Sequence, residues 1–154
     1  MKKYFKSFIV ALLIGLFLSN LFLNQYNDYN GVKVSLNGDN LYFIQYGVFS
    51  SKSSMEENTI ALQNYVYNIE DEKYYVYVGI TNLEENKNKI IEYYKKEGYD
   101  TIVKEYQVSN EIFLKELEKY DEVLKNTTDK IAISSVMNQV LMKYEEVVID
   151  GDKD

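Results

Sequence analysis

The sequence predicts an α+β fold: a four-stranded antiparallel sheet in the ferredoxin-like split βαβ order (βαββαβ), with one transmembrane helix before it and a helical hairpin after it. Two segments of similar pattern, residues 41–50 (LYFIQYGVFS) and 73–82 (KYYVYVGITN), each precede a helical pattern. A βαβ unit that recurs at this distance favours the split βαβ arrangement, in which both helices cover one sheet face and leave the other open. The transmembrane helix and the hairpin follow from the apolar patterns at the two ends of the chain.

The N-terminus has the pattern of a membrane anchor. Residues 2–6 carry three lysines, and residues 8–23 (FIVALLIGLFLSNLFL) carry no charge. A spanning helix needs about 20 apolar residues, which Tyr4 and Phe5 help to supply. No small-x-small cleavage site follows, so a retained anchor over residues 1–24 is favoured over a cleaved signal peptide, which stays the alternative. Both place the lysines in the cytoplasm and the remaining chain outside the membrane.

The next elements are a linker, a strand and a helix. Residues 25–40 are rich in Asn, Asp and Gly and predict a linker. Residues 41–47 alternate between the two sheet faces and predict the first strand. The pattern of a capping box at Ser54 and Glu57, repeated one residue earlier, predicts the start of the first helix.

The second half repeats this order and completes the domain over residues 41–107. Asn82, followed by Glu85, is the expected cap of the second helix, and Gly98 lies just past its end. The strands are predicted at residues 65–69, 74–79 and 101–106, with a charged turn at 70–73.

Residues 108–149 predict two antiparallel helices. Asn110 opens the first, and residues 126–129 (NTTD) end it and cap the second. Apolar residues recur at helical spacing along both helices, while the tail at 150–154 is charged. Such a hairpin either packs on itself or on the domain, or it binds a partner.

Residues 42–106 resemble a SPOR domain, the sporulation- and cell-division-related module that binds peptidoglycan in bacterial envelope proteins. The family's first strand reads aromatic-x-Val-Gln-Val-Gly-x-Phe, matched here by residues 42–49 (YFIQYGVF). Its second half begins Tyr-x-Val-x-Val-Gly, matched by residues 74–79 (YYVYVG), and Gly98-Tyr99 matches the end of its second helix. The resemblance implies a non-catalytic domain that binds glycan strands on the open sheet face, where Gln45 occupies the position of a strand-one Gln.

Strand alternation indicates which side chains would form that face. Phe43 and Gln45 lie on one face of the first strand, and the valines of residues 74–79 should face the core, which leaves Tyr75 and Tyr77 on the open side. Aromatic planes suit the C–H faces of sugar rings, and an amide suits their hydroxyls. We therefore expect Phe43, Gln45, Tyr75 and Tyr77 to bind glycan.

Composition excludes several other functions. Without His or Cys the chain has no thiolate chemistry, no His-based triad and no Cys/His zinc site. All 17 basic residues are Lys, and the net charge of −7 disfavours nucleic-acid binding. The paired acids stand at expected helix starts and in a turn, where capping and solvation explain them. We expect no enzymatic activity, no metal and no cofactor.

The sequence therefore favours a single-pass membrane protein whose extracytoplasmic domain binds peptidoglycan glycan strands, in cell division or sporulation. The alternative is an envelope adaptor that recruits a protein through its C-terminal helices, with the sheet domain as a degenerate scaffold. The position of the hairpin bears on this choice. If it covered the open face, the glycan site would be lost or moved, and recruitment would become the better hypothesis.

Overall fold

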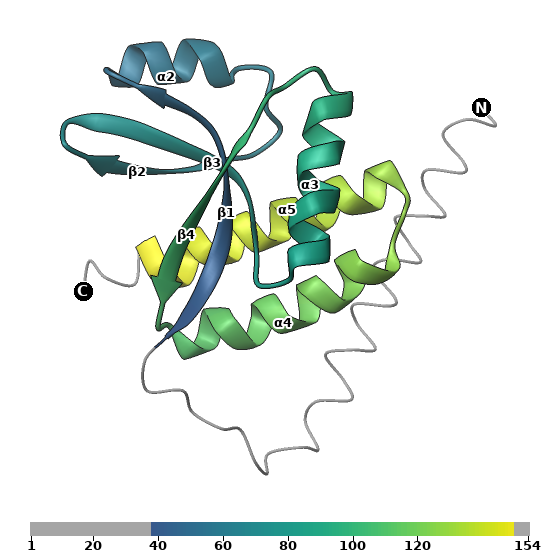
Figure 1. The fold of residues 1–154 in the computed structure, drawn as a ribbon. Coiled ribbons are helices and arrows are strands. Elements are labelled where there is room, and N and C mark those ends of the chain that lie inside the picture. Colours follow the sequence, from purple (N-terminus) through teal and green to yellow (C-terminus); the bar gives the residue numbers. More distant parts are fainter. Residues whose placement is uncertain (1–37, 150–154) are drawn as a thin grey trace.

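The computed structural model describes residues 38–149 (Figure 1). The elements are β1 (Asp39–Phe49), α2 (Lys52–Thr59), β2 (Val66–Glu70), β3 (Lys73–Thr81), α3 (Glu84–Lys96), β4 (Ile102–Val108), α4 (Glu111–Asn126), α5 (Lys130–Tyr144) and the π-helical turn η2 (Glu145–Ile149). The predicted βαββαβ order followed by two helices is confirmed. The expected anchor and tail lie outside the described residues, and no helix within 38–149 is long and apolar enough to cross a membrane.

The four strands form one antiparallel sheet in the order β2-β3-β1-β4, which is the order of the split βαβ arrangement. The two central strands, β1 and β3, are the two segments that the sequence analysis found to be similar. Their register shifts twice around Gln45, so Tyr46 and Val78 each lack an opposite partner. Such irregularities increase local twist.

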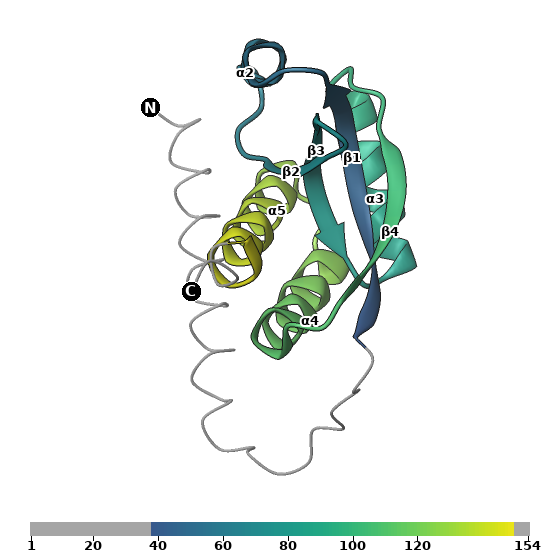
Figure 2. The ribbon, with the colours of Figure 1, turned by 90° about the vertical axis from the view of Figure 1, so that its left-hand side faces the viewer.

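Helices α2 and α3 both contact the central strands β1 and β3. The α3 helix approaches β3 closely at Gly79, where an added Cβ would stand 2.9 Å from Cγ2 of Ile90. The Tyr46 side chain of β1 contacts both helix regions: its hydroxyl donates to the carbonyl oxygen of Asn58 in α2 (3.0 Å), and its ring packs edge-on against Tyr99 just after α3. Figure 2 shows α3 on one side of the sheet and α4 and α5 on the other.

Both predicted helix caps in the first two helices are wrong. Ser51, two residues after the end of β1, caps α2 by accepting from the Ser54 backbone N–H (3.2 Å), so Ser54 lies inside the first turn. Leu83 takes the N-cap position of α3 and gives no side-chain cap. Asn82 instead donates its backbone N–H to a carboxylate oxygen of Asp121 in α4 (2.8 Å). A residue 39 positions away thus binds the backbone just before α3, which local patterns could not indicate.

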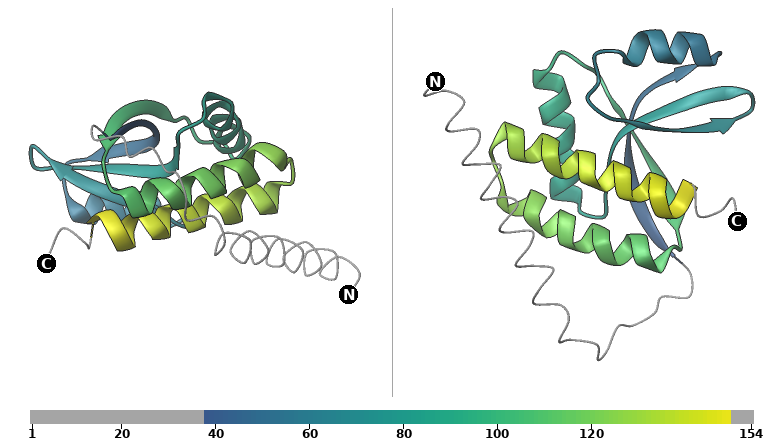
Figure 3. Two further views of the ribbon diagram at one scale, coloured as in Figure 1. Left: turned by 90° about the horizontal axis from the view of Figure 1, so that it is seen from below. Right: turned by 180° about the vertical axis from the view of Figure 1, so that it is seen from behind.

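The predicted hairpin forms, with its predicted first cap. The Asn110 side chain accepts a hydrogen bond from the Phe113 backbone N–H (2.9 Å). The Asp129 side chain accepts one from the Ala132 backbone N–H (2.9 Å). The helices α4 and α5 lie side by side and run in opposite directions (Figure 3). Their apolar stripes are buried, with Phe113, Leu117, Leu124, Val136 and Val140 all below one-tenth exposure.

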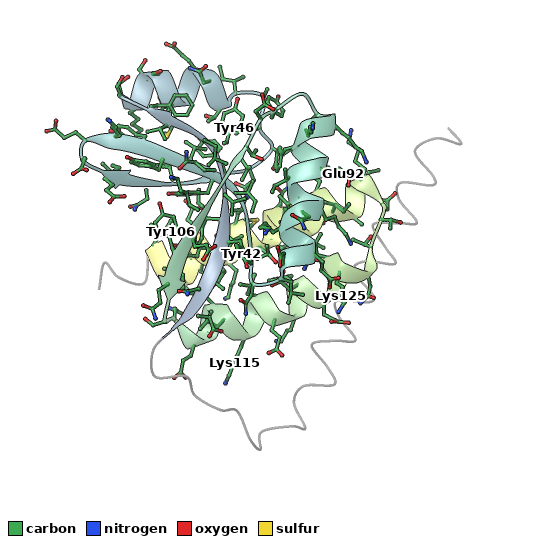
Figure 4. All side chains as sticks on the ribbon, in the orientation of Figure 1. Tyr42, Tyr46, Glu92, Tyr106, Lys115 and Lys125 are labelled. Atoms are coloured by element: carbon green, nitrogen blue, oxygen red, sulfur yellow. The ribbon has the colours of Figure 1, made fainter. Side chains whose placement is uncertain are left out.

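Polar contacts fix the hairpin to α3. The Lys89 ammonium donates to three carbonyl oxygens at the end of α4, those of Leu124 (2.6 Å), Lys125 (2.8 Å) and Thr127 (2.8 Å). These are carbonyls that a helix end leaves without an intrahelical partner, and a cation there also complements the helix dipole. Lys125, labelled in Figure 4, pairs with Glu85 of α3 (3.2 Å).

Candidate functional site

The sheet face predicted to be open is covered. Phe43, Gln45 and Tyr77 are 2, 4 and 3 % exposed, and Tyr75 is half-buried. The cover is the hairpin: α5 packs along β3, and the Tyr144 ring lies against Phe43. The prediction of a bare face is therefore wrong. The physical reason is that the hairpin has apolar stripes of its own, and burying them against an aromatic sheet face removes both surfaces from water.

Aromatic rings fill the space between this face and α5. Phe43 makes edge-to-face contacts with Tyr77 (5.3 Å between centroids), Tyr106 (5.1 Å) and Tyr144 (5.4 Å). Tyr106 comes from β4 (labelled in Figure 4), so the cluster joins three strands to a helix. Edge-to-face geometry suits the positive ring edge and the negative ring face of aromatic side chains.

The hydroxyls of Tyr77 and Tyr106 are hydrogen-bonded to each other at 2.6 Å. Burial above all, and then the neighbouring Tyr106, raise the pKa of Tyr77 well above its ordinary value. Tyr77 is therefore a neutral phenol at any physiological pH. The pair offers one donor and several lone pairs without charge.

A cleft borders this cluster. Its volume is about 370 Å³, and it lies where β2, β3 and β4 meet the end of α5 and η2. We call it the sheet cleft; residues that line it include Phe43, Val66, Asn68, Tyr77, Tyr106 and Tyr144. Asn68 is exposed at its edge and shares a face with Tyr77, whereas alternation places the Tyr67 ring on the opposite face. The residues that line the cleft include no charged side chain.

The structure brings together only two of the four predicted site residues in this cleft. Phe43 and Tyr77 line it, whereas Gln45 and Tyr75 do not. The Gln45 Oε1 atom is buried and finds no hydrogen-bond partner among residues 38–149. Tyr75 packs against the core from the same face, outside the cleft. The glycan-binding role of all four residues stays a prediction.

The other residues of the cleft were not predicted as site residues, among them Tyr106, Tyr144 and Asn68. Tyr106 is the last residue of a predicted strand. Side-chain alternation along that strand would have put Tyr106 on the same face as Phe43, but only once the pairing of the two strands was known. Tyr144 lay on the predicted apolar stripe of the second hairpin helix, but which surface that stripe would cover could not be predicted. Asn68 carries no signal of its own.

The sheet cleft suits a neutral, partly apolar ligand. Aromatic rings line its base, and amide and phenol groups supply hydrogen bonds. Within residues 38–149, no group of three or more Asp and Glu residues has the arrangement to hold a metal ion. What the cleft can do chemically is to stack on and hydrogen-bond a ring-shaped polar molecule.

Comparison with known proteins gives one structural similarity. No model of a protein family and no curated protein matches the chain. Among solved structures, the chain is similar to the peptidoglycan-binding domain of the B. subtilis cell wall lytic enzyme CwlC. The identity is 27 % and the TM-score 0.39, over 50 % of this chain and 100 % of that one.

Proposed function

We propose that the chain is a non-catalytic protein of the bacterial envelope that binds glycan strands of peptidoglycan through the sheet cleft. The observation that carries this proposal is the aromatic cluster around Phe43, which borders the sheet cleft together with Asn68 and the hydrogen-bonding hydroxyls of Tyr77 and Tyr106. The resemblance of residues 42–106 to SPOR domains supports the same ligand. On this proposal the binding site has moved from the open face to the edge of the hairpin.

The charge distribution is compatible with this ligand. A glycan backbone presents flat C–H surfaces and hydroxyls, so binding needs stacking and hydrogen bonds rather than charge neutralisation. Without the three N-terminal lysines the net charge falls from −7 to −10, which disfavours purely electrostatic adhesion to anionic polymers. A neutral cleft in an acidic domain avoids this repulsion.

The N-terminal pattern supports the proposed location. Three lysines followed by the uncharged run of residues 8–23 favour a single-pass anchor with the folded domain outside the membrane. Such an anchor would keep the sheet cleft close to the cell wall. Fractionation of cells expressing the full chain tests this part, with recovery in the membrane fraction after a carbonate wash as the expected result.

The binding proposal is tested by co-sedimentation of the full chain, in a mild detergent, with purified sacculi. Asn68→Trp should fill the sheet cleft and lower the bound fraction at least fivefold, because Asn68 is exposed at its edge. Ile69→Trp is the matched control, since Ile69 is exposed on the same strand but alternation places it on the opposite face, and it does not line the cleft. Equal binding by Asn68→Trp and the wild type would contradict the proposal.

A second function, an envelope adaptor, is favoured by the covered sheet itself. If the family's glycan surface is closed permanently, the hairpin is free to present its outer side to a protein. Ile112 of α4 is 61 % exposed and lines neither the sheet cleft nor the cleft beside α5. A photo-crosslinking residue at position 112 distinguishes the two functions in cells, because adaptor function predicts a discrete protein adduct and glycan binding at the sheet cleft predicts none.

A further inference from the structure

We propose that a second cleft, beside α5 and distinct from the sheet cleft, binds a neutral saccharide. This cleft has a volume of about 730 Å³ and lies between α5, the segment that follows α2 and the C-terminal end of α3. We call it the helix cleft. The inference rests on the proposed function for its class of ligand, but it assigns that ligand to different residues.

The walls of the helix cleft are held together by polar contacts. Ser134 of α5 donates its hydroxyl to Gln63 Oε1 (2.5 Å), and the Asn64 amide donates to the Asn138 carbonyl oxygen (3.4 Å). Lys130, at the start of α5, pairs with Glu97 at the end of α3. Contacts from α5 to both other walls mean that the cleft is formed before any ligand arrives, which lowers the entropy cost of binding.

Two tyrosine rings are fixed in this cleft. Tyr93 and Tyr99 are both half-buried and both line it. The Tyr93 ring packs edge-on against Tyr94 (5.1 Å), and the Tyr99 ring packs likewise against Tyr46 (5.5 Å). Rings supported in this way keep their orientation, so they can stack on the C–H face of a sugar with little loss of side-chain entropy.

The polar groups of the helix cleft are almost all neutral. Three side-chain amides, those of Gln63, Asn138 and Gln139, line it together with the hydroxyl of Ser135. Each amide can donate and accept, as the rim of a sugar ring requires. The only charged residues in the lining, Lys130 and Glu97, pair with each other. A phosphate or carboxylate ligand would therefore meet no uncompensated cation there.

The size of the cleft agrees with this ligand. Ligand sites in proteins commonly occupy about 300–1,000 Å³, and the helix cleft falls within that range. Exposed Met142 and Ile131 also line it and add apolar surface for C–H groups. Rings, amides and a paired charge together match a short neutral oligosaccharide better than an ion or a charged peptide.

The test is NMR titration of the isotope-labelled full chain, in detergent micelles, with the neutral tetrasaccharide of β-1,4-linked N-acetylglucosamine. Backbone amide signals of Ser135, Asn138 and Gln139 should shift on titration. Gln139→Ala should weaken the affinity at least fivefold, because it removes an amide from a half-buried position in the lining. Lys95→Ala, an exposed change on α3 outside the lining, is the control and should bind like the wild type.

The outcomes separate this inference from the proposed function. Shifts confined to Val66 and Asn68 would overturn the helix cleft and support the sheet cleft. Shifts confined to Ser135, Asn138 and Gln139 would support the helix cleft and contradict the sheet cleft as the binding site. No shift at either would overturn both. Tyr93→Phe serves as a second variant that preserves the ring, and affinity lost with Tyr93→Ala but kept with Tyr93→Phe supports stacking.

Discussion

The ring of Tyr144, at the end of α5, lies edge-on against the ring of Phe43 in the centre of the sheet, with centroids 5.4 Å apart and planes at 76°. The same ring contacts Phe113 of α4 at 5.1 Å. One side chain therefore joins the sheet to both helices of the hairpin. Because of this contact, the hairpin belongs to the hydrophobic core and the sheet cleft exists only at its edge.

Tyr144→Ala should lower the free energy of unfolding by about 2 kcal/mol or more. Truncation of a fully buried large aromatic side chain to Ala costs about 3–5 kcal/mol. The expected loss is smaller here because Tyr144 is half-buried. Urea denaturation followed by circular dichroism measures the change. Tyr144→Phe keeps the ring and should lose much less. A Tyr144→Ala protein as stable as the wild type would show that the hairpin is not held by this contact.

Lys89→Met should weaken the docking of the hairpin by about 1–2 kcal/mol. The substitution keeps the apolar stem but removes the ammonium that donates to three carbonyls at the end of α4, and hydrogen bonds from charged groups contribute about 1.5–3 kcal/mol when well buried. Lys95→Met is the control, since Lys95 is exposed on the same helix. Hydrogen exchange of α4 amides should accelerate in Lys89→Met alone; equal rates in both variants would contradict the prediction.

Asp121 makes the stability depend on pH. Burial raises the pKa of its carboxyl, against the lowering effect of hydrogen bonds from Thr81, the Asn82 backbone and Asn86. The folded protein then binds a proton more readily than the unfolded chain. The ionised carboxylate thus costs stability above the folded pKa, and this cost disappears as the pH falls through that pKa toward the ordinary value of about 4.

Compared with Asp121→Asn, the wild type should therefore gain stability as the pH falls from 7 toward 4. The other carboxylates titrate in both proteins, so their contributions cancel in the difference. The measurement is the difference in urea midpoint between the two proteins at several pH values. A difference that moves in the opposite direction would mean that the three hydrogen bonds outweigh burial and that the pKa is lowered.

Gln45→Met should stabilise the fold by about 1 kcal/mol. Its Oε1 is buried without a hydrogen-bond partner among the described residues, and an unsatisfied buried polar group costs about 1–3 kcal/mol. Methionine has a similar length and no such requirement. The thermal midpoint of the variant should rise while its binding to sacculi stays unchanged. Loss of binding at retained stability would restore the sequence-based role of Gln45 and indicate that the hairpin moves away when glycan binds.

The structure confirms those parts of the prediction that depend on local patterns. Alternation along residues 41–47 and 74–79 predicted β1 and β3, and the similarity of the two segments predicted the split βαβ arrangement, in which the structure places them at the centre of the sheet. Helical spacing predicted the hairpin and Asn110 as its first cap. The caps of α2 and α3 were predicted wrongly because several Ser and Asn residues compete locally and because Asp121 acts from another helix.

By itself, the sequence determined the order of the elements, the alternation of side chains along the regular parts of each strand and the apolar stripes of the hairpin, because these depend on periods of 2 and 3.6 residues within one segment. Only the tertiary structure decided which surface the hairpin covers. Phe43 and Tyr77 present an aromatic face that either a ligand or a helix can cover, and the periodicity is the same in both cases. The choice depends on how Tyr144 and Phe113 fit against that face. These residues are distant from the sheet in the sequence, so this fit forms only when the chain folds.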